Sequence, residues 1–111
     1  MKHKLLFDFI CPQLAMLVDC PPKEKGWIHE IKFDGHRLQV HFKKNKVKIF
    51  SRNGHELSHK FPELIMSFKK LPIKSAIFDG EAVVLDKNGI SSFVKLQEAL
   101  SQHRSDFIKI F

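Results

Sequence analysis

One octet, Glu30-Ile31-Lys32-Phe33-Asp34-Gly35-His36-Arg37, constrains this chain more than any other feature. If it is a strand that runs into a turn, side chains alternate with a period of two, and Glu30, Lys32 and Asp34 share one face. The opposite face is then apolar, with Ile31 and Phe33. An acid, a lysine and an acid in successive same-face positions admit a simple explanation, a solvated face that neutralises its own charge. Two further segments bear on whether that explanation is sufficient.

These segments are Ser51-Arg52-Asn53-Gly54 and Phe78-Asp79-Gly80-Glu81. The second lies inside an apolar run that suits a core strand, and its two carboxylates fall on one face. Unpaired acids are too costly in such a place to be incidental. An acid pair at a sheet edge, bonded to nearby lysines, remains the structural alternative, and for Arg52 the alternative is an ordinary turn arginine.

The hydrophobic pattern predicts an α+β fold with an antiparallel sheet and packed helices. Residues 1–26 contain three prolines and no sustained period, so we expect an irregular arm there. Strands are expected at residues 27–32, 37–42, 47–51 and 75–85, with the second and third paired as a hairpin. Helical spacing predicts helices over residues 61–71 and after a cap at Ser91 or Ser92, and a last strand begins near residue 107.

Composition favours a polyanionic partner. The chain has 19 Lys and Arg against 12 acids, a formal net charge of +7 and a pI near 9.6, which suits nucleic acid. Cys11 and Cys20 lie outside any C-x-x-C pair and are interpreted as reduced cytosolic thiols. The apolar stretch near the amino terminus is short and interrupted, so we expect no membrane anchor and a cytoplasmic location. His55 and His59 have an i, i+4 spacing without a third ligand and are interpreted as surface histidines.

Written as E-x-K-x-D-G-x-R, the octet resembles the nucleophile motif of the ATP-dependent DNA ligases, which are covalent nucleotidyltransferases. The two later segments resemble further motifs of that family, in the expected order. The flanking sequence, from Pro12 and Leu14-Ala15 through Gly26-Trp27 to Lys60-Phe61-Pro62-Glu63-Leu64, is most similar to the bacterial ligases of non-homologous end joining. The resemblance implies that residues 27–111 are the N-terminal part of an ATP-grasp-like adenylation domain, which ends before the family's later motifs.

The resemblance implies that Lys32 attacks the α-phosphate of ATP and keeps AMP as a phosphoramide. An amine is a nucleophile only when it is unprotonated, and an ordinary lysine pKa of about 10.4 leaves almost none of it so at neutral pH. Lys32 therefore needs surroundings that disfavour its charged form, such as a divalent metal ion, Mg²⁺ or Mn²⁺, and other basic groups. The same cations would neutralise the phosphates.

The other motif residues are given roles only through the resemblance. Glu30 is similar to the acid that accepts a hydrogen bond from the adenine amino group. Arg37 is similar to the arginine near the ribose and the nick. Asp34 and Gly35 would shape the turn that presents the lysine, for which glycine's tolerance of positive φ is useful. Arg52 is similar to the arginine that grips phosphate on the nicked strand.

In the third motif, Glu81 is similar to the acid that contacts the ribose hydroxyl and the metal, with Asp79 its supporting neighbour and Gly80 allowing close approach. The expected partner is nicked or broken double-stranded DNA. Because the family's later motifs are absent here, we expect weak or no AMP transfer by the isolated chain, and a role for the missing half or a repair partner. Two alternatives remain: an RNA ligase or capping-type nucleotidyltransferase, and a non-catalytic fragment that binds DNA or a ligase partner.

Overall fold

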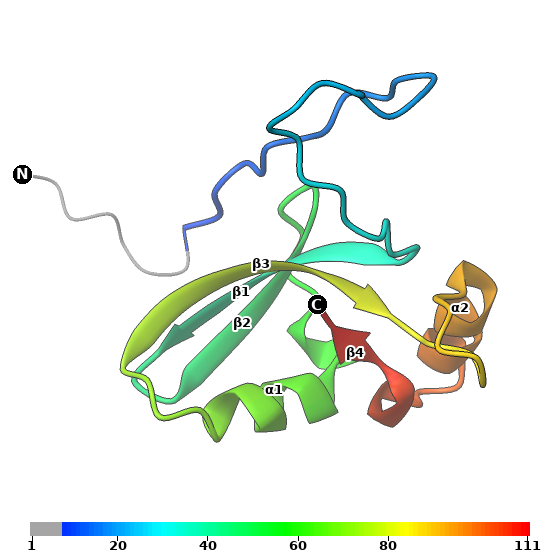
Figure 1. Cartoon of the computed structure of the whole chain (residues 1–111). Coiled ribbons are helices and arrows are strands. Elements are labelled where there is room, and N and C mark those ends of the chain that lie inside the picture. Colours follow the sequence, from blue (N-terminus) through cyan, green and yellow to red (C-terminus); the bar gives the residue numbers. More distant parts are fainter. Residues whose placement is uncertain (1–7) are drawn as a thin grey trace, which may run out of the picture.

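The computed structural model describes residues 8–111, and the first seven residues of the predicted arm lie outside this range. Its centre is a four-stranded antiparallel sheet in the order β2-β1-β3-β4 (Figure 1). The elements, in chain order, are β1 (His36–Lys43), β2 (Lys46–Ser51), the 3-10 turn η1 (Ser58–Lys60), α1 (Pro62–Lys69), β3 (Ser75–Val83), α2 (Phe93–Ser101), the 3-10 turn η2 (Ser105–Phe107) and β4 (Lys109–Ile110). The predicted α+β class is confirmed.

β1 and β2 form the predicted hairpin, in which Lys43 faces Lys46 next to the turn. The two turn residues, Lys44 and Asn45, both have positive φ, as the right-handed twist of a two-residue hairpin requires. The chain then passes through η1 and α1 before β3 returns on the other side of β1. β1 is therefore paired along both edges and holds the centre of the sheet.

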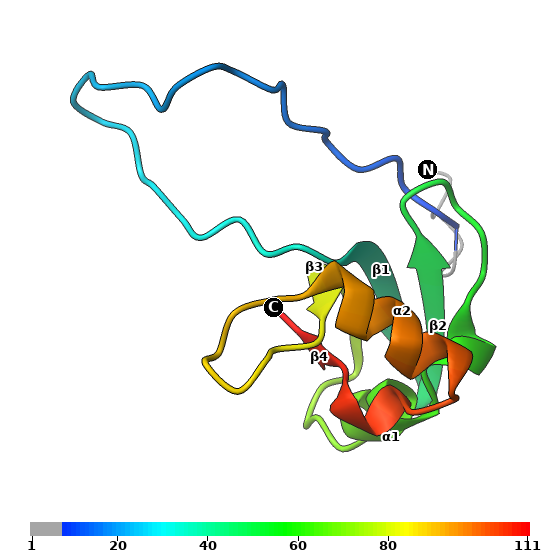
Figure 2. The same ribbon diagram turned by 90° about the vertical axis from the view of Figure 1, so that its right-hand side faces the viewer.

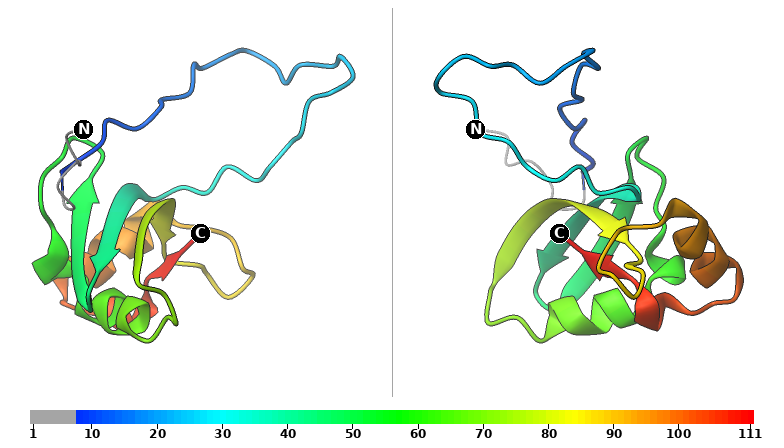
Figure 3. Two further views of the ribbon diagram at one scale, coloured as in Figure 1. Left: turned by 90° about the vertical axis from the view of Figure 1, so that its left-hand side faces the viewer. Right: turned by 45° about the vertical axis from the view of Figure 1, so that its right-hand side comes forward.

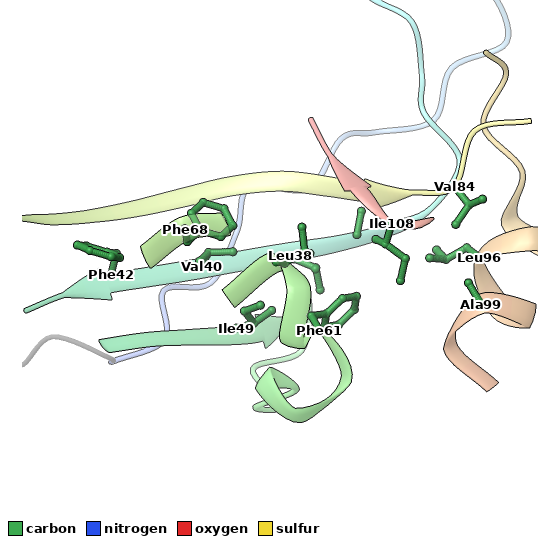
Figure 4. Close-up of a cluster of buried hydrophobic side chains, with 12 residues drawn as sticks. Leu38, Val40, Phe42, Ile49, Phe61, Phe68, Val84, Leu96, Ala99 and Ile108 are labelled. Carbon is green, nitrogen blue, oxygen red and sulfur yellow. The ribbon is translucent and has the colours of Figure 1, made fainter. Parts of the chain in front are cut away.

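The core lies between one face of the sheet and the helices (Figure 4). Leu38, Val40 and Phe42 alternate along β1 toward this side and are almost fully buried. Helix α1 begins with Pro62, which suits a first turn, and α2 is capped by Ser92, whose hydroxyl accepts a hydrogen bond from the Lys95 amide at 3.3 Å. Of the two cap candidates, Ser91 and Ser92, the structure therefore selects Ser92. The core side chains are Leu38, Val40, Phe42, Ile49, Phe61, Leu64, Phe68, Ala82, Val84, Leu96, Ala99 and Ile108.

The opposite face of the sheet contacts residues 9 and 10 of the arm. Gln39, on β1, is buried there and bonds both backbone groups of Ile10, accepting from the amide at 3.0 Å and donating to the carbonyl at 2.7 Å. The Phe9 ring lies 6.0 Å from that of Phe50 on β2. Further along, the chain leaves the sheet and returns just before β1, so it forms a wide loop (Figures 2 and 3).

The predicted strand at residues 27–32 is wrong. The chain is extended there but pairs with no strand of the described residues, and the first strand starts at His36. Trp27, Ile28 and Ile31 are 61%, 86% and 79% exposed, so the alternation of the octet does not mark a buried face. A strand needs a neighbour that satisfies its backbone, which periodicity does not guarantee. The predicted boundary at residue 26 stays a prediction.

The last predicted strand is confirmed in part, because β4 covers two residues and is preceded by η2. None of the helices in residues 8–111 is long and apolar enough to cross a lipid bilayer.

Candidate functional site

A cavity of about 1020 Å³ opens at the end of the sheet where β1 begins and β2 ends. The loop after β2 and helix α2 lie at this same end (Figure 2). Six of the residues singled out by the sequence line it, although they come from segments far apart in the chain. They are Lys32, Asp34, Gly35, Arg37, Arg52 and Glu81. Glu30 and Asp79 are not among the lining residues.

Contacts on both sides hold the octet against the folded body, even though it is not a strand. The Phe33 ring stacks on that of Phe111, with centroids 4.4 Å apart and planes 9° from parallel. The Asp34 amide donates a hydrogen bond to the Ser91 hydroxyl at 2.8 Å. Because Lys32 directly precedes these two anchored residues, the segment places it at the cavity while leaving it exposed.

Gly35 is required for close approach rather than for an unusual dihedral angle. The glycines with positive φ in residues 8–111 are Gly26, Gly54 and Gly89, so the expectation of positive φ at Gly35 is wrong. A Cβ atom at Gly35 would lie 2.0 Å from the carbonyl oxygen of Ala82 on β3. The glycine therefore lets the octet's backbone press directly onto the strand that carries Glu81.

Arg37 and Asp79 form a two-pronged ion pair on adjacent strands. Nε of Arg37 lies 3.0 Å from one carboxylate oxygen and an Nη lies 2.8 Å from the other. The hydrogen bond from Arg37 holds the pKa of Asp79 below its ordinary value. The other Nη of Arg37 donates to the carbonyl of Gln13 at 2.5 Å. Arg37 thus links β1, β3 and the arm.

Glu81 faces Arg37 directly across the β1–β3 pair, so both side chains are on the same side of the sheet. Burial raises the pKa of Glu81, against the opposing influence of Lys32, Arg37 and His36. Its backbone exchanges two hydrogen bonds with Phe111, at 2.8 and 3.0 Å, which fixes the strand at this point. Glu81 is therefore a half-buried carboxylate among cationic groups.

Arg52 lies in the turn that ends β2, as the sequence predicts. The turn is closed by the Gly54 amide, which donates to the Ser51 carbonyl at 3.0 Å, and by the His55 amide, which donates to the Ser51 hydroxyl at 3.1 Å. Gly54 has φ 85°, which only glycine adopts easily. The guanidinium of Arg52 is exposed and makes no ion pair within residues 8–111.

The carboxylates near the cavity suit a metal ion that is coordinated mainly by the oxygen atoms of a bound ligand. No group of three or more His, Cys, Asp or Glu side chains gathers in the described residues. Both carboxylate oxygens of Asp79 already accept hydrogen bonds from Arg37. Of the two acids expected to bind a metal, Glu81 is therefore the better candidate. Mg²⁺ commonly takes one or two protein carboxylates and completes its shell with substrate phosphates and water.

The cavity also contains residues that the sequence did not indicate. His59 and Lys60 of η1 and His103, which follows α2, line it together with Gln97 and Ser101. No local pattern marks them, because they meet only through the packing of α2 against the end of the sheet. His59 is exposed, as the interpretation of a surface histidine expects, and it also lines the cavity.

Comparisons with known proteins identify the family. The family model described as an ATP dependent DNA ligase domain matches residues 12–110 of this chain. The chain is 37% identical over 101 residues to the multifunctional non-homologous end joining protein LigD of Pseudomonas aeruginosa, and the match covers 91% of this chain and 12% of that protein. It is 42% identical over 88 residues to a DNA ligase of Methanococcus aeolicus, covering 76% of this chain and 16% of that one.

Two solved structures are similar in fold and in sequence. The ligase domain of LigD from M. tuberculosis has a TM-score of 0.58 at 36% identity, and the match covers 62% of this chain and 23% of that one. A mycobacterial DNA ligase D complexed with ATP and MES has a TM-score of 0.60 at 32% identity, covering 73% and 25%. The chain therefore spans a small part of the length of the relatives it matches.

Proposed function

The chain belongs to the family of ATP-dependent DNA ligases, and we propose that its cavity binds ATP and that Lys32 takes AMP from it. One observation carries the proposal: the cavity joins residues from all three motifs, Lys32 from the octet, Arg52 from the second and Glu81 from the third. A similar chain described as complexed with ATP supports the choice of nucleotide.

In the proposed step the lone pair of Lys32 Nζ attacks the α-phosphorus of ATP. A P–N bond forms, the bond from the α-phosphorus to the bridging oxygen breaks, pyrophosphate leaves with that oxygen, and Nζ loses a proton. Lys32 is accessible for this attack because it is exposed at the cavity and has no hydrogen bond or ion pair with the described residues, and nearby cations in the bound complex would favour its unprotonated form. A bound Mg²⁺ or Mn²⁺ would neutralise negative charge on the phosphates.

We assign the other side chains to binding. Glu30 accepts a hydrogen bond from the adenine amino group, and Asp34 and Gly35 position the lysine. Glu81, half-buried beside cationic groups, binds the ribose hydroxyl and is the carboxylate that would hold the metal, with Asp79 supporting it through Arg37.

The proposed substrate is nicked or broken double-stranded DNA. The formal net charge of +7 favours a polyanion, and the relatives named for end joining point to repair of double-strand breaks. Arg37 is assigned to the ribose and the nick, and Arg52 to phosphate on the nicked strand. Sealing would need further parts of a ligase, in the same or another polypeptide, and would take place in the cytosol or nucleoid, where DNA and ATP meet.

Intact mass after incubation with ATP and Mg²⁺ tests the proposal. We expect a small fraction of the chain to gain one AMP, Lys32→Ala to gain none, and Lys25→Ala, which removes an exposed lysine of the same arm, to behave as the parent. Equal labelling by GTP would favour a capping-type enzyme. AMP on the Lys32→Ala chain would exclude Lys32 as the nucleophile, and a parent chain that neither gains AMP nor binds ATP in calorimetry would contradict nucleotide binding.

A further inference from the structure

Part of the cavity wall is basic and has no role in the proposed reaction. Lys60 and His59 reach it from η1, and His103 reaches it from the end of α2, on the side formed by the loop after β2 and the helix. Arg52 lines the cavity from that same loop. Four basic side chains from two distant parts of the sequence thus meet at one cavity.

These side chains are not neutralised by the protein. Within residues 8–111, no hydrogen bond or ion pair involves the side chain of Arg52, His59, Lys60 or His103. The cavity's lining carboxylates are Asp34 and Glu81, which the proposed function assigns to the nucleotide. A concave surface with an excess of unpaired positive charge concentrates anions.

His103 follows the end of α2, and its backbone places the imidazole at the cavity. Its φ is 54°, in the left-handed region that glycine adopts without strain and that suits the residue after a helix end. The His103 amide donates to the Leu100 carbonyl at 3.3 Å, which closes the last turn of α2.

We propose that Lys60, His59 and His103, together with Arg52, form a phosphate-binding subsite. Lysine offers a point charge with three donors, histidine offers ring N–H donors, and arginine offers a planar fork. The volume of about 1020 Å³ lies at the upper end of the usual range for ligand pockets, about 300–1,000 Å³, and so leaves room for a group beyond the adenosine and α-phosphate. The subsite deepens the proposed function and rests on it for the identity of the cavity.

The phosphate has two candidate sources, the strand end of DNA and the triphosphate tail of ATP. Fluorescence anisotropy with a nicked duplex that ends in a 5′-phosphate, compared with the same duplex ending in a 5′-hydroxyl, reports on the first source. Competition by inorganic tripolyphosphate reports on the second. Both measurements use the chain of 111 residues.

Three variants make the test specific. Lys60→Ala removes a cation at the subsite, and Lys43→Ala removes an exposed cation at the far end of β1, so the two have the same net charge. His103→Gly removes the imidazole and relieves the positive φ, so it should not unfold the chain. We expect Lys60→Ala to weaken binding of the phosphate probe about tenfold and to lower the salt slope by about 1. His103→Gly should weaken it less, and Lys43→Ala hardly at all.

A selective loss with the 5′-phosphate duplex would support the strand end as the source, and a selective loss in tripolyphosphate competition would support the nucleotide tail. The subsite would be overturned if, in both measurements, Lys60→Ala and His103→Gly weakened binding no more than Lys43→Ala does. The two proposals can fail separately. If Lys32 takes up AMP but the variants show no selective loss of phosphate binding, the subsite alone is refuted. If the variants lose phosphate binding selectively but the chain never takes up AMP, the transfer step is refuted and the subsite stands.

Discussion

Replacing Gly35 by alanine should detach the octet from the sheet. The added methyl would lie 2.0 Å from the Ala82 carbonyl oxygen and 2.8 Å from a Val83 side-chain carbon. Ala82 cannot retreat, because β3 is paired on both sides, with His36 of β1 and Ile110 of β4 opposite this residue. The segment that carries Lys32 must move instead.

The cost follows from the contacts that this movement breaks. The hydrogen bond from the Asp34 amide to Ser91 contributes about 1 kcal/mol. The stack of Phe33 on Phe111 contributes about 1 kcal/mol more. The sum, about 2 kcal/mol, lies within the range of about 1–3 kcal/mol for overpacking a well-filled site. For a chain of this size it corresponds to a fall in Tm of about 8 °C.

Thermal unfolding by circular dichroism and hydrogen exchange at the Asp34 amide would measure the effect. Gly26→Ala is the matched control in the same arm, since Gly26 has φ 99° and an added Cβ atom there would meet nothing within 4 Å. It should cost about 1 kcal/mol or less through backbone strain and leave the Asp34 amide protected. A Gly35→Ala chain that melts within about 2 °C of the parent, with that amide still protected, would refute the reasoning.

Three further predictions concern the sheet. A double-mutant cycle with Arg37→Ala and Asp79→Ala, by denaturant unfolding, should give a coupling of about 0.5–1 kcal/mol at neutral pH, since the side chains are 30% and 47% exposed. Because the pKa of Asp79 is lowered on folding, this coupling should persist above the ordinary aspartate pKa and vanish as the pH falls through the folded value; a coupling that survives in strong acid would contradict the pair. Burial raises the pKa of Glu81, so ionisation of this carboxyl lowers stability as the pH rises through its pKa in the folded state. The Tm of Glu81→Gln should therefore equal or exceed that of the parent at pH 7, and the difference in Tm should disappear below about pH 4. Gln39→Leu removes both hydrogen bonds to Ile10 and should cost about 1–2 kcal/mol and speed cleavage of the arm by thermolysin, a change that an unanchored arm would not show.

The regular elements of the folded body were predictable because each has a local cause. The two strands of the hairpin alternate around a polar turn, α1 repeats its apolar residues at helical spacing after Pro62, and Ser92 caps α2. The strand predicted at the octet is wrong because the side chains there alternate with the period of a strand, but the segment has no neighbouring strand to pair with. Lys32 and Asp34 of the octet line the cavity instead of a paired sheet.

Six of the eight motif residues predicted for the site line the cavity, and its geometry was only partly predictable. The motif residues could be found one by one, but the hydrogen bonds of Arg37 to Asp79 depend on the pairing of β1 with β3, which no local pattern specifies. The role of Gly35 depends on the same pairing. His59, Lys60 and His103 meet only after α2 has packed, so their shared cavity could not be read from one sequence.

The guanidinium of Arg37 has a limited number of hydrogen atoms, and most of them are already engaged. It donates to both oxygens of Asp79 and to the Gln13 carbonyl, so the arm and the third motif depend on one side chain. A ligand oxygen that takes a donor from Gln13 loosens the arm, and an arm that holds the donor weakens the ligand by the same free energy. Where a ligand oxygen competes with Gln13 for that donor, binding of the ligand and the contact of the arm with Arg37 disfavour each other.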